Sequence, residues 1–523
     1  MPRTRLPAVL LATFVLVLLP VVAVADDGRT DSRASFDLGA ATIPDLQRRM
    51  DRGQLTSVGL TSAYLRRIAA IDGKIHSVIA VNGRALAEAS ASDVRRRDGR
   101  TRGPLDGIPV LLKDNIDTRG EPTTAGSRVF DGTRPAADAH LVARLHRAGA
   151  VILGKANLSE WANFRSTHST SGWSGVGGQT NNPYVLDRNP CGSSSGSGAA
   201  IAAALAQVTI GTETDGSIVC PAGANGIVGH KPTLGLVSRT GVVPISAEQD
   251  TAGPMARHVV DAAITLSVLQ GRDAADAATH AIPTGQPRDY AALLRPNALR
   301  GTRIGVWRLS GVDADVDRVV NESVAVLRSR GATVIDVELP YQDLVNENEF
   351  PALLTEFRRD LNAYLGARPG APDTLAEVIA FNRTDPVELS KFGQELFEQA
   401  EVAPPPTDPT YLNRRRTATD AARRSIDETM DRFDLDAIMA PTNSPAWRTD
   451  YTAGDAFVLG SSGPAAVAGY PNVSVPAGFA GPLPVGVSFF AERWSDAKVL
   501  ALAAAFERAN PTYRPPEFIP TTG

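Results

Sequence analysis

The sequence predicts one large α/β domain. Short apolar runs typical of buried strands alternate with helical patterns along the chain. No internal repeat and no linker of about 15 residues or more separates these elements. The chain has 523 residues, of which 43% are hydrophobic, so it can bury a large core. Length alone would allow about two to four domains, so the absence of linkers favours a single one.

The first part of the chain contains two expected helices and an expected strand. A helical pattern runs over 43–70, and Thr42 is a plausible helix cap in front of it. A second helix is expected near 81–97. The apolar run 107–112 is short and ends at the charged residue Lys113, which is typical of a buried strand that reaches the edge of a sheet.

The middle of the chain contains an unusual loop. A helix is expected over 139–148 and a buried strand over 151–155. Residues 166–198 are rich in Ser, Gly, Asn and Thr, a composition that flexible linkers share. An Ala-rich helix over 199–206 and a strand at 208–210 follow at once, so we expect an ordered loop instead. Ordered loops of this kind often present backbone N–H groups to a ligand.

The last part of the chain is expected to return to strands and helices. The expected elements are a strand at 302–307, a helix at 317–329, a strand at 333–337, helices over most of 350–440 with a break at 403–406, a strand at 437–441 and a helix near 496–508.

Charge and motif content exclude several function classes. The net charge is −4 and the pI is near 6.0, so nothing indicates binding to nucleic acid or to an anionic membrane surface. Motifs for zinc hydrolysis and for a phosphate-binding loop do not occur, and there is no Gly-x-Ser-x-Gly nucleophile elbow with a downstream His in an obvious place. The seven histidines have no supporting context, so surface or packing roles are expected for them. Only six of the 53 basic residues are lysines, so each lysine stands out.

The first 25 residues have the pattern of a secretory signal peptide. Basic residues precede an apolar run, and Ala23 and Ala25 form a small-x-small cleavage site before Asp26. A membrane anchor is the alternative, because the run is just long enough to cross a bilayer. Cleavage after Ala25 is favoured, and it would leave a disordered segment over 26–35 and no stable membrane anchor. We therefore expect a protein that is secreted, periplasmic or otherwise exterior to the cell.

The two cysteines, Cys191 and Cys220, leave two states open. An exported protein allows a disulfide between them, and a pair of buried thiols fits the sequence equally well. Two cysteines are too few for a metal site of the usual spacing. The pairing depends on the Cα separation, which the sequence does not supply.

Two Ser- and Gly-rich motifs follow each other closely. Pro-Cys-Gly-Ser-Ser-Ser-Gly-Ser-Gly occupies 190–198, and Gly-Thr-Glu-Thr-Asp-Gly-Ser occupies 211–217. Their serines Ser193 and Ser217 are 24 positions apart. Together with Lys113 upstream, this spacing resembles the amidase signature family, and the residues of both motifs are most similar to those of bacterial peptide amidases. The chemistry of the site is therefore expected to be that of a serine amidase.

Further motifs extend the resemblance over about residues 36–515, which leaves 516–523 as a tail. They include Gly-Pro-Leu-Asp-Gly-Ile-Pro at 103–109, Gly-His-Lys-Pro-Thr at 229–233 and Gly-Tyr-Pro at 469–471. The resemblance implies a single domain with a central mixed β-sheet that is covered by helices on both faces. It also implies hydrolysis of carboxamide C–N bonds, with a small-molecule or peptide amide as substrate and with no metal and no cofactor. The oligomeric state stays open.

The resemblance also assigns roles to individual residues. Ser217 is expected to attack the carbonyl carbon, and Ser193 is expected to relay its proton to Lys113. To accept that proton, Lys113 must be neutral, and burial lowers the pKa of a lysine in this way. The peptide bond between Gly192 and Ser193 is expected to be cis. The oxyanion hole is expected to consist of the backbone N–H groups of Thr214, Asp215, Gly216 and Ser217.

Three further positions are considered separately. Ser194 is expected either to hydrogen-bond the relay or to hold its loop. Asp215 replaces a glycine that is usual in the family, and we hypothesise that its carboxylate shapes the choice of substrate. His230 replaces a usual leucine, and the sequence explains nothing about it.

Four functions are compatible with these residues to different degrees. The favoured one is hydrolysis of the C-terminal amides of peptides. A general aliphatic or aryl acylamidase would share the same triad. The glutaminase subunit of a tRNA amidotransferase would need cytoplasmic partners, which the signal segment argues against. An inactive binding protein is disfavoured because Lys113, Ser193 and Ser217 are all present.

Overall fold

Residues 37–522 are described by a computed structural model, and they belong to one compact unit. The predicted signal peptide over 1–25 and the predicted disordered segment over 26–35 lie outside the described residues. No helix in the described part of the chain is long and apolar enough to span a membrane.

An 11-stranded mixed sheet forms the centre of this unit, in the order β1-β3-β2-β6-β8-β7-β12-β13-β11-β9-β10. The strands β3, β2 and β6 are parallel, as are β11, β9 and β10, and antiparallel pairs join these two groups. The strands are β1 (Val78–Val81), β2 (Pro109–Lys113), β3 (Val151–Ala156), β6 (Val208–Glu213), β7 (Val228–Lys231), β8 (Thr251–Ala256), β9 (Arg303–Val306), β10 (Thr333–Asp336), β11 (Ala437–Pro441), β12 (Asn472–Ala480) and β13 (Leu483–Phe490), with a separate small hairpin of β4 (Trp173–Ser174) and β5 (Gly178–Gln179).

Helices cover the sheet on both faces. Every residue of β2, β3, β6, β8 and β11 is buried, and successive side chains of a strand point to opposite faces. The predicted α/β class is therefore confirmed. The helices are α1 (Ile43–Asp51), α2 (Ser57–Ile75), α3 (Ala85–Arg97), α4 (His140–Arg147), α5 (Ser195–Ala202), α6 (Val219–Ala224), α7 (Val259–Leu269), α8 (Ala314–Ser329), α9 (Gln342–Gly366), α10 (Leu375–Asn382), α11 (Glu395–Glu401), α12 (Pro409–Phe433), α13 (Gly463–Ala468) and α14 (Asp496–Ala509).

The N-terminal helices differ from the expectation in two places. The helical pattern over 43–70 is interrupted, because Gly53 has a φ of 66° and a left-handed residue cannot continue the helix. Thr56 then caps α2 by accepting a hydrogen bond from the N–H of Gly59. The helix expected near 81–97 starts only at Ala85, because Val81 ends the edge strand β1 and a turn at 83–84 precedes the helix.

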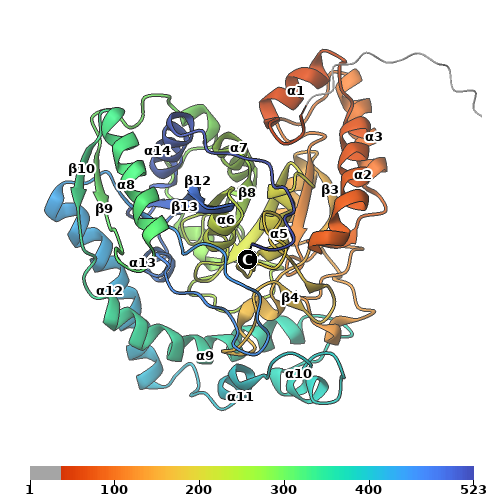
Figure 1. Cartoon of the computed structure of the whole chain (residues 1–523). Coiled ribbons are helices and arrows are strands. Elements are labelled where there is room, and N and C mark those ends of the chain that lie inside the picture. The colour runs from red at the N-terminus through yellow and green to blue at the C-terminus, as the bar shows by residue number, and fades with distance from the viewer. Residues whose placement is uncertain (1–36, 523) are drawn as a thin grey trace, which may run out of the picture. The chain divides into compact units, whose positions relative to one another are not determined.

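The other expected elements are present, with boundaries that shift by a few residues. The expected strand, helix and strand of 302–337 are β9, α8 and β10, which lie at the opposite end of the unit from α1, α2 and α3 (Figure 1). The break at 403–406 falls between α11 and α12. In Figure 1, helices α9, α10 and α11 line one side of the unit, where Trp161, Phe357 and Phe397 pack in an apolar cluster.

The two Ser-rich motifs and Lys113 meet at the C-terminal ends of two neighbouring strands. The strands β2 and β6 are parallel neighbours, with Leu112 opposite Ile210, so their C-terminal ends lie together. Helix α5 begins at Ser195, directly after the start of the first motif. The loop over 166–198 that leads into it is mostly buried and hydrogen-bonded, which agrees with an ordered loop.

Candidate active site

Lys113 and Ser193 are in direct contact. Lys113 is the last residue of β2, and its Nζ lies 2.7 Å from the Oγ of Ser193. Both residues are completely buried, whereas Ser217 keeps 8% exposure. The peptide bond between Gly192 and Ser193 is cis, as the resemblance implied. Lys113 and Ser193 are therefore paired in the interior, and Ser217 is the one of the three residues that keeps some exposure to solvent.

Burial changes the charge state of Lys113. Loss of solvent destabilises the ammonium form and lowers the pKa of Lys113 to about 7, although the carboxylates of Asp250 and Glu213 pull in the other direction. At neutral pH a substantial fraction of Lys113 is then an uncharged amine. That form has a lone pair and can accept a proton.

Thr212 directs this lone pair. Besides Ser193, the Nζ of Lys113 contacts the carbonyl oxygen of Thr212 at 3.2 Å and its Oγ1 at 2.9 Å. A neutral amine has two N–H groups, so donation of both to Thr212 leaves the lone pair facing Ser193. Asn115 donates to the same Oγ1 at 2.9 Å. Sequence reasoning missed Thr212 and Asn115, because neither position carries a residue-type signal of its own.

Ser194 joins the two motifs. Its N–H donates to the carbonyl oxygen of Ser217 at 3.1 Å, and its Oγ donates to the carbonyl oxygen of Thr212 at 3.1 Å. Its Oγ also accepts from the N–H of Thr212 at 3.2 Å. Of the two roles considered for Ser194, these contacts correspond to holding the loop.

The turn at 214–217 presents free N–H groups. Glu213 accepts hydrogen bonds from the N–H groups of Ile218 at 2.8 Å and Val219 at 3.0 Å, on the far side of Ser217. The N–H groups of 214–217 donate to no acceptor in the described part of the chain. Free N–H groups at a turn can bind an oxyanion, which is the chemistry predicted for them.

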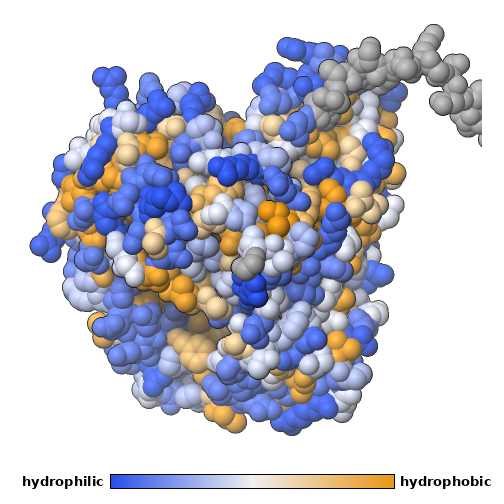
Figure 2. Space-filling view, in the orientation of Figure 1, coloured by the Kyte–Doolittle hydropathy of each residue, from blue (hydrophilic) through white to orange (hydrophobic). Residues whose placement is uncertain are grey.

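A cavity of about 320 Å³ opens beside the two serines. Its lining includes Gly192, next to Ser193, and Asp215 and Gly216, next to Ser217. The face drawn in Figure 2 is hollowed above α9, with hydrophobic residues in the hollow. A substrate that occupies the cavity would thus lie against both motifs.

Asp215 directs a carboxyl group into this cavity. Its side chain lines the cavity and is exposed to solvent. The protein packed around the carboxyl group raises its pKa through desolvation, while a hydrogen bond from Ser462 opposes that rise. Glu349, on α9, also has a raised pKa because of burial and because of the negative charge of Asp215. The glycine-to-aspartate change thus adds an acidic group that the substrate meets.

Cys191 and Cys220 form a disulfide with a Cα separation of 6.0 Å. The sequence had left this pairing open. Both cysteines line the cavity, and the bridge connects the residues that flank Ser193 to the helix α6 that follows Ser217. It therefore ties together the two motifs of the site.

Removing this disulfide is expected to destabilise the protein. A cross-link with a sequence separation of 29 restricts the unfolded chain, and the double substitution C191A/C220A should lower the free energy of unfolding by about 3–4 kcal/mol. Urea denaturation followed by fluorescence would measure the loss. Wild-type protein in a reducing agent is the matched control and should show the same midpoint as the variant. An unchanged midpoint in both would contradict the expectation.

Two further positions from the motifs have structural partners. The carboxylate of Asp114 accepts a hydrogen bond from the N–H of Thr124 at 3.0 Å and lies 3.4 Å from the Nζ of Lys155, so it holds the loop after β2. His230 is buried, with its Nε2 3.2 Å from Asp496, and this partner explains the departure from leucine. The pKa of Asp496 is lowered by these contacts, which outweigh the effect of burial.

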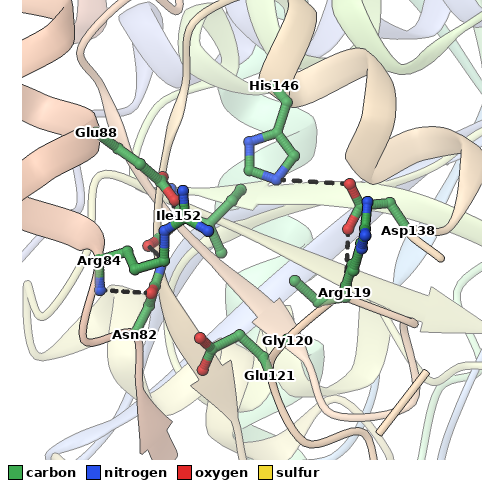
Figure 3. A pocket seen from close by; sticks show the side chains of 10 residues that line it. Asn82, Arg84, Glu88, Arg119, Gly120, Glu121, Asp138, His146 and Ile152 are labelled. Atoms are coloured by element: carbon green, nitrogen blue, oxygen red, sulfur yellow. Dashed lines mark hydrogen bonds and ion pairs between the residues drawn. The ribbon is translucent and has the colours of Figure 1, made fainter. Parts of the chain in front are cut away.

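A second cavity, of about 550 Å³, contains none of the predicted site residues (Figure 3). Charged side chains of both signs line it. His146 lies 3.8 Å from Asp138, whose carboxylate also accepts from the N–H of Arg119, and Glu88 approaches Asn82 on the other side. It is larger than the cavity beside Ser217, but it brings no nucleophile and base together.

Similarity to known proteins agrees with this site. Residues 59–500 match the family model described as Amidase. Among solved structures, the peptide amidase PAM in complex with the competitive inhibitor chymostatin is 49% identical, with a TM-score of 0.90, and covers 92% of this chain and 100% of that chain. The native peptide amidase from Stenotrophomonas maltophilia is 48% identical, with a TM-score of 0.88 and the same coverage.

Curated relatives span two activities. A probable amidase of Arabidopsis thaliana is 39% identical over 507 residues, which is 93% of each chain. One subunit of the glutamyl-tRNA(Gln) amidotransferase of Roseiflexus sp. is 35% identical over 484 residues, which is 90% of this chain and 96% of that protein.

Proposed function

Because this chain belongs to the amidase family and is a hydrolase of amide C–N bonds, we propose that it removes the C-terminal carboxamide of peptides through an acyl-enzyme on Ser217. The observation that carries the proposal is the contact of 2.7 Å between Lys113 and Ser193, together with a cavity lined by Gly192 and Gly216, the residues that precede Ser193 and Ser217. A serine hydroxyl is a weak nucleophile and needs such a base.

Attack on the carbonyl carbon begins with proton transfer. Ser217 passes its hydroxyl proton to Ser193 as its Oγ bonds to the carbonyl carbon, and Ser193 passes its own proton to the lone pair of Lys113. The C=O electron pair moves to oxygen and forms an oxyanion. The free N–H groups of 214–217 stabilise that oxyanion, and loss of one such donor typically costs about 3–4 kcal/mol.

Departure of the nitrogen requires the proton to return. An amide anion is a very poor leaving group, so protonated Lys113 gives its proton back through Ser193 to the leaving nitrogen. The C–N bond then breaks and ammonia leaves, with the acyl group on Ser217. Water attacks this ester with the same relay as base, and the peptide acid is released.

The choice of a peptide substrate rests on similarity. Two of the solved structures with TM-scores of 0.88 and 0.90 are peptide amidases, one of them bound to the inhibitor chymostatin. A cavity of about 320 Å³ accommodates one or two amino-acid residues beside Ser217. The similarity to peptide amidases supports a short peptide amide over free glutamine, and the cavity volume is large enough for such a substrate.

A substrate panel tests this function. Ammonia release should be measured for a dipeptide amide, free glutamine and an aliphatic amide, and aniline release should be measured for an anilide. The dipeptide amide should have the largest kcat/KM. A larger value for glutamine would favour the activity of the amidotransferase relatives, and a larger value for the anilide would favour a general acylamidase.

The pH dependence of kcat/KM reports on Lys113. Its pKa in the folded protein is about 7, and the base is active only when deprotonated. We therefore expect kcat/KM to rise tenfold per pH unit below about 7 and to level off above it. Initial rates between pH 5 and 9, at a substrate concentration well below KM, measure this profile. A plateau that extends down to pH 5 would contradict a neutral lysine base.

We also propose that the protein is exported. The predicted signal peptide ends at Ala25, outside the described residues. The disulfide between Cys191 and Cys220 supports an oxidising compartment, because cytosolic proteins seldom keep such bonds. The N-terminal sequence of the protein recovered from its host would test this, and it should begin at Asp26.

A further inference from the structure

The cavity beside Ser217 contains two carboxyl groups and no basic residue in its lining. Asp215 enters from the motif of Ser217, and Asp455 enters from the loop between β11 and α13. Neither carboxyl group forms an ion pair with any residue of the described chain. Their negative charge is therefore available to a ligand.

Asp455 is held entirely by uncharged donors. Its Oδ1 accepts from the N–H of Ser171 at 3.0 Å, the Nδ2 of Asn189 at 3.2 Å and the Nε1 of Trp447 at 3.2 Å. These bonds orient the carboxylate but do not neutralise it. Burial raises its pKa, against the effect of these hydrogen bonds. A carboxylate in this position favours a cation that arrives with the substrate.

Two aromatic rings stand beside this carboxylate. Trp447 and Phe457 also line the cavity, and their ring centroids are 5.9 Å apart in an edge-to-face arrangement. Phe457 is 46% exposed, so its ring is accessible to a ligand in the cavity. An ammonium or guanidinium group is attracted by the faces of such rings as well as by a carboxylate.

The nearby lysine does not cancel this charge. Lys231 acts on Asp215 through space, but it is almost completely buried, its pKa is lowered by burial, and it does not line the cavity. Its Nζ donates to the carbonyl oxygen of Pro232 at 3.2 Å. The pKa of Glu349, near Asp215, is raised to about 8, so this group is largely uncharged at neutral pH and adds little to the charge. The negative charge that the substrate meets therefore comes from the two carboxyl groups that line the cavity, Asp455 and Asp215.

We propose that this cavity selects peptide amides that carry a positive charge within about two residues of the scissile carbonyl, with Asp455 as the main specificity-determining residue and Asp215 as the second. The inference rests on the proposed function and names its substrate class. The cation is either a basic side chain or the free N-terminal ammonium of a short peptide. A substrate with a carboxylate at the same place is repelled.

Matched dipeptide amides test the proposal. Ammonia release should be measured for acetyl-Gly-Lys-amide, acetyl-Gly-norleucine-amide and acetyl-Gly-Glu-amide, which differ in charge at similar length. Gly-norleucine-amide with a free N-terminus separates the ammonium from the side-chain cation. We expect kcat/KM about tenfold higher for at least one cationic substrate than for acetyl-Gly-norleucine-amide, with the Glu substrate lowest.

Variants locate the source of this preference. D455N should reduce the ratio of kcat/KM between cationic and neutral substrates to below about threefold, and D215N should reduce it partly. The ratio is independent of a general loss of activity, so it remains a valid measure if either variant is less stable. D420N, which removes an exposed carboxylate on α12, is the control and should keep the wild-type ratio.

Two results would overturn the inference. One is equal kcat/KM for cationic and neutral peptide amides in the wild-type protein, and the other is an unchanged ratio in both D455N and D215N. Failure of the proposed function looks different, because then none of the four peptide amides would release ammonia. Hydrolysis of the neutral peptide amide alone therefore supports the proposed function and rejects the charge preference.

Discussion

S217A is expected to lower kcat for peptide-amide hydrolysis by about 10⁴- to 10⁶-fold, because no acyl-enzyme can form without the hydroxyl. Fold and stability should be retained, since Ser217 is 8% exposed and loses only one oxygen atom. Ammonia release under saturating substrate measures the loss. Residual activity should come only from the oxyanion-binding N–H groups and from substrate binding.

The matched control for this variant is S329A. Ser329 is the last residue of α8, is exposed, and lies outside the site, so its loss should leave kcat within about twofold of wild type. Rapid-quench experiments with wild-type protein add a direct readout, because the acyl group should be recovered on the peptide that contains Ser217. Full turnover by S217A would show that another group is the nucleophile.

K113M is expected to lower kcat by about 10³- to 10⁵-fold with little change in stability. The relay would lose its proton acceptor, while Ser193 and Ser217 stay in place. Because burial lowers the pKa of Lys113 to about 7, the native side chain is already largely neutral at pH 8. Its removal therefore does not deprive any carboxylate of a direct ionic partner. Thermal unfolding and initial rates at pH 8 measure the two effects.

K155M provides the contrast for that variant. Lys155 lies on the neighbouring strand β3, is equally buried, and its Nζ is 3.4 Å from the carboxylate of Asp114. Removing it leaves Asp114 buried without a cation, which should cost about 3–5 kcal/mol of stability. The two variants should therefore differ in their properties: K113M should be folded and inactive, whereas K155M should be destabilised. A K113M variant that retains wild-type kcat would contradict the mechanism.

Local patterns predicted most of the elements but not their interruptions. The apolar run before Lys113 and the one at 151–155 became the buried strands β2 and β3. The interruption near Gly53 was missed, because a single glycine within a helical pattern does not by itself end a helix. The edge strand β1 was missed as well, since four residues at the end of an apolar pattern fit a helix equally well.

The sequence by itself determined which residue types the proposed catalysis uses and how far apart the two serines lie. These are one scarce lysine at the end of a strand, and Ser193 and Ser217, which are 24 positions apart. These features are local, so they can be identified without coordinates. Only the tertiary structure decided the contacts that make them chemically useful. These contacts join segments that are distant in the chain. They include the packing that buries Lys113, its hydrogen bonds to Thr212, the disulfide beside both serines and the approach of Asp455. Such long-range packing sets solvation and distance, and these two quantities determine the pKa of the base and the charge that a substrate encounters.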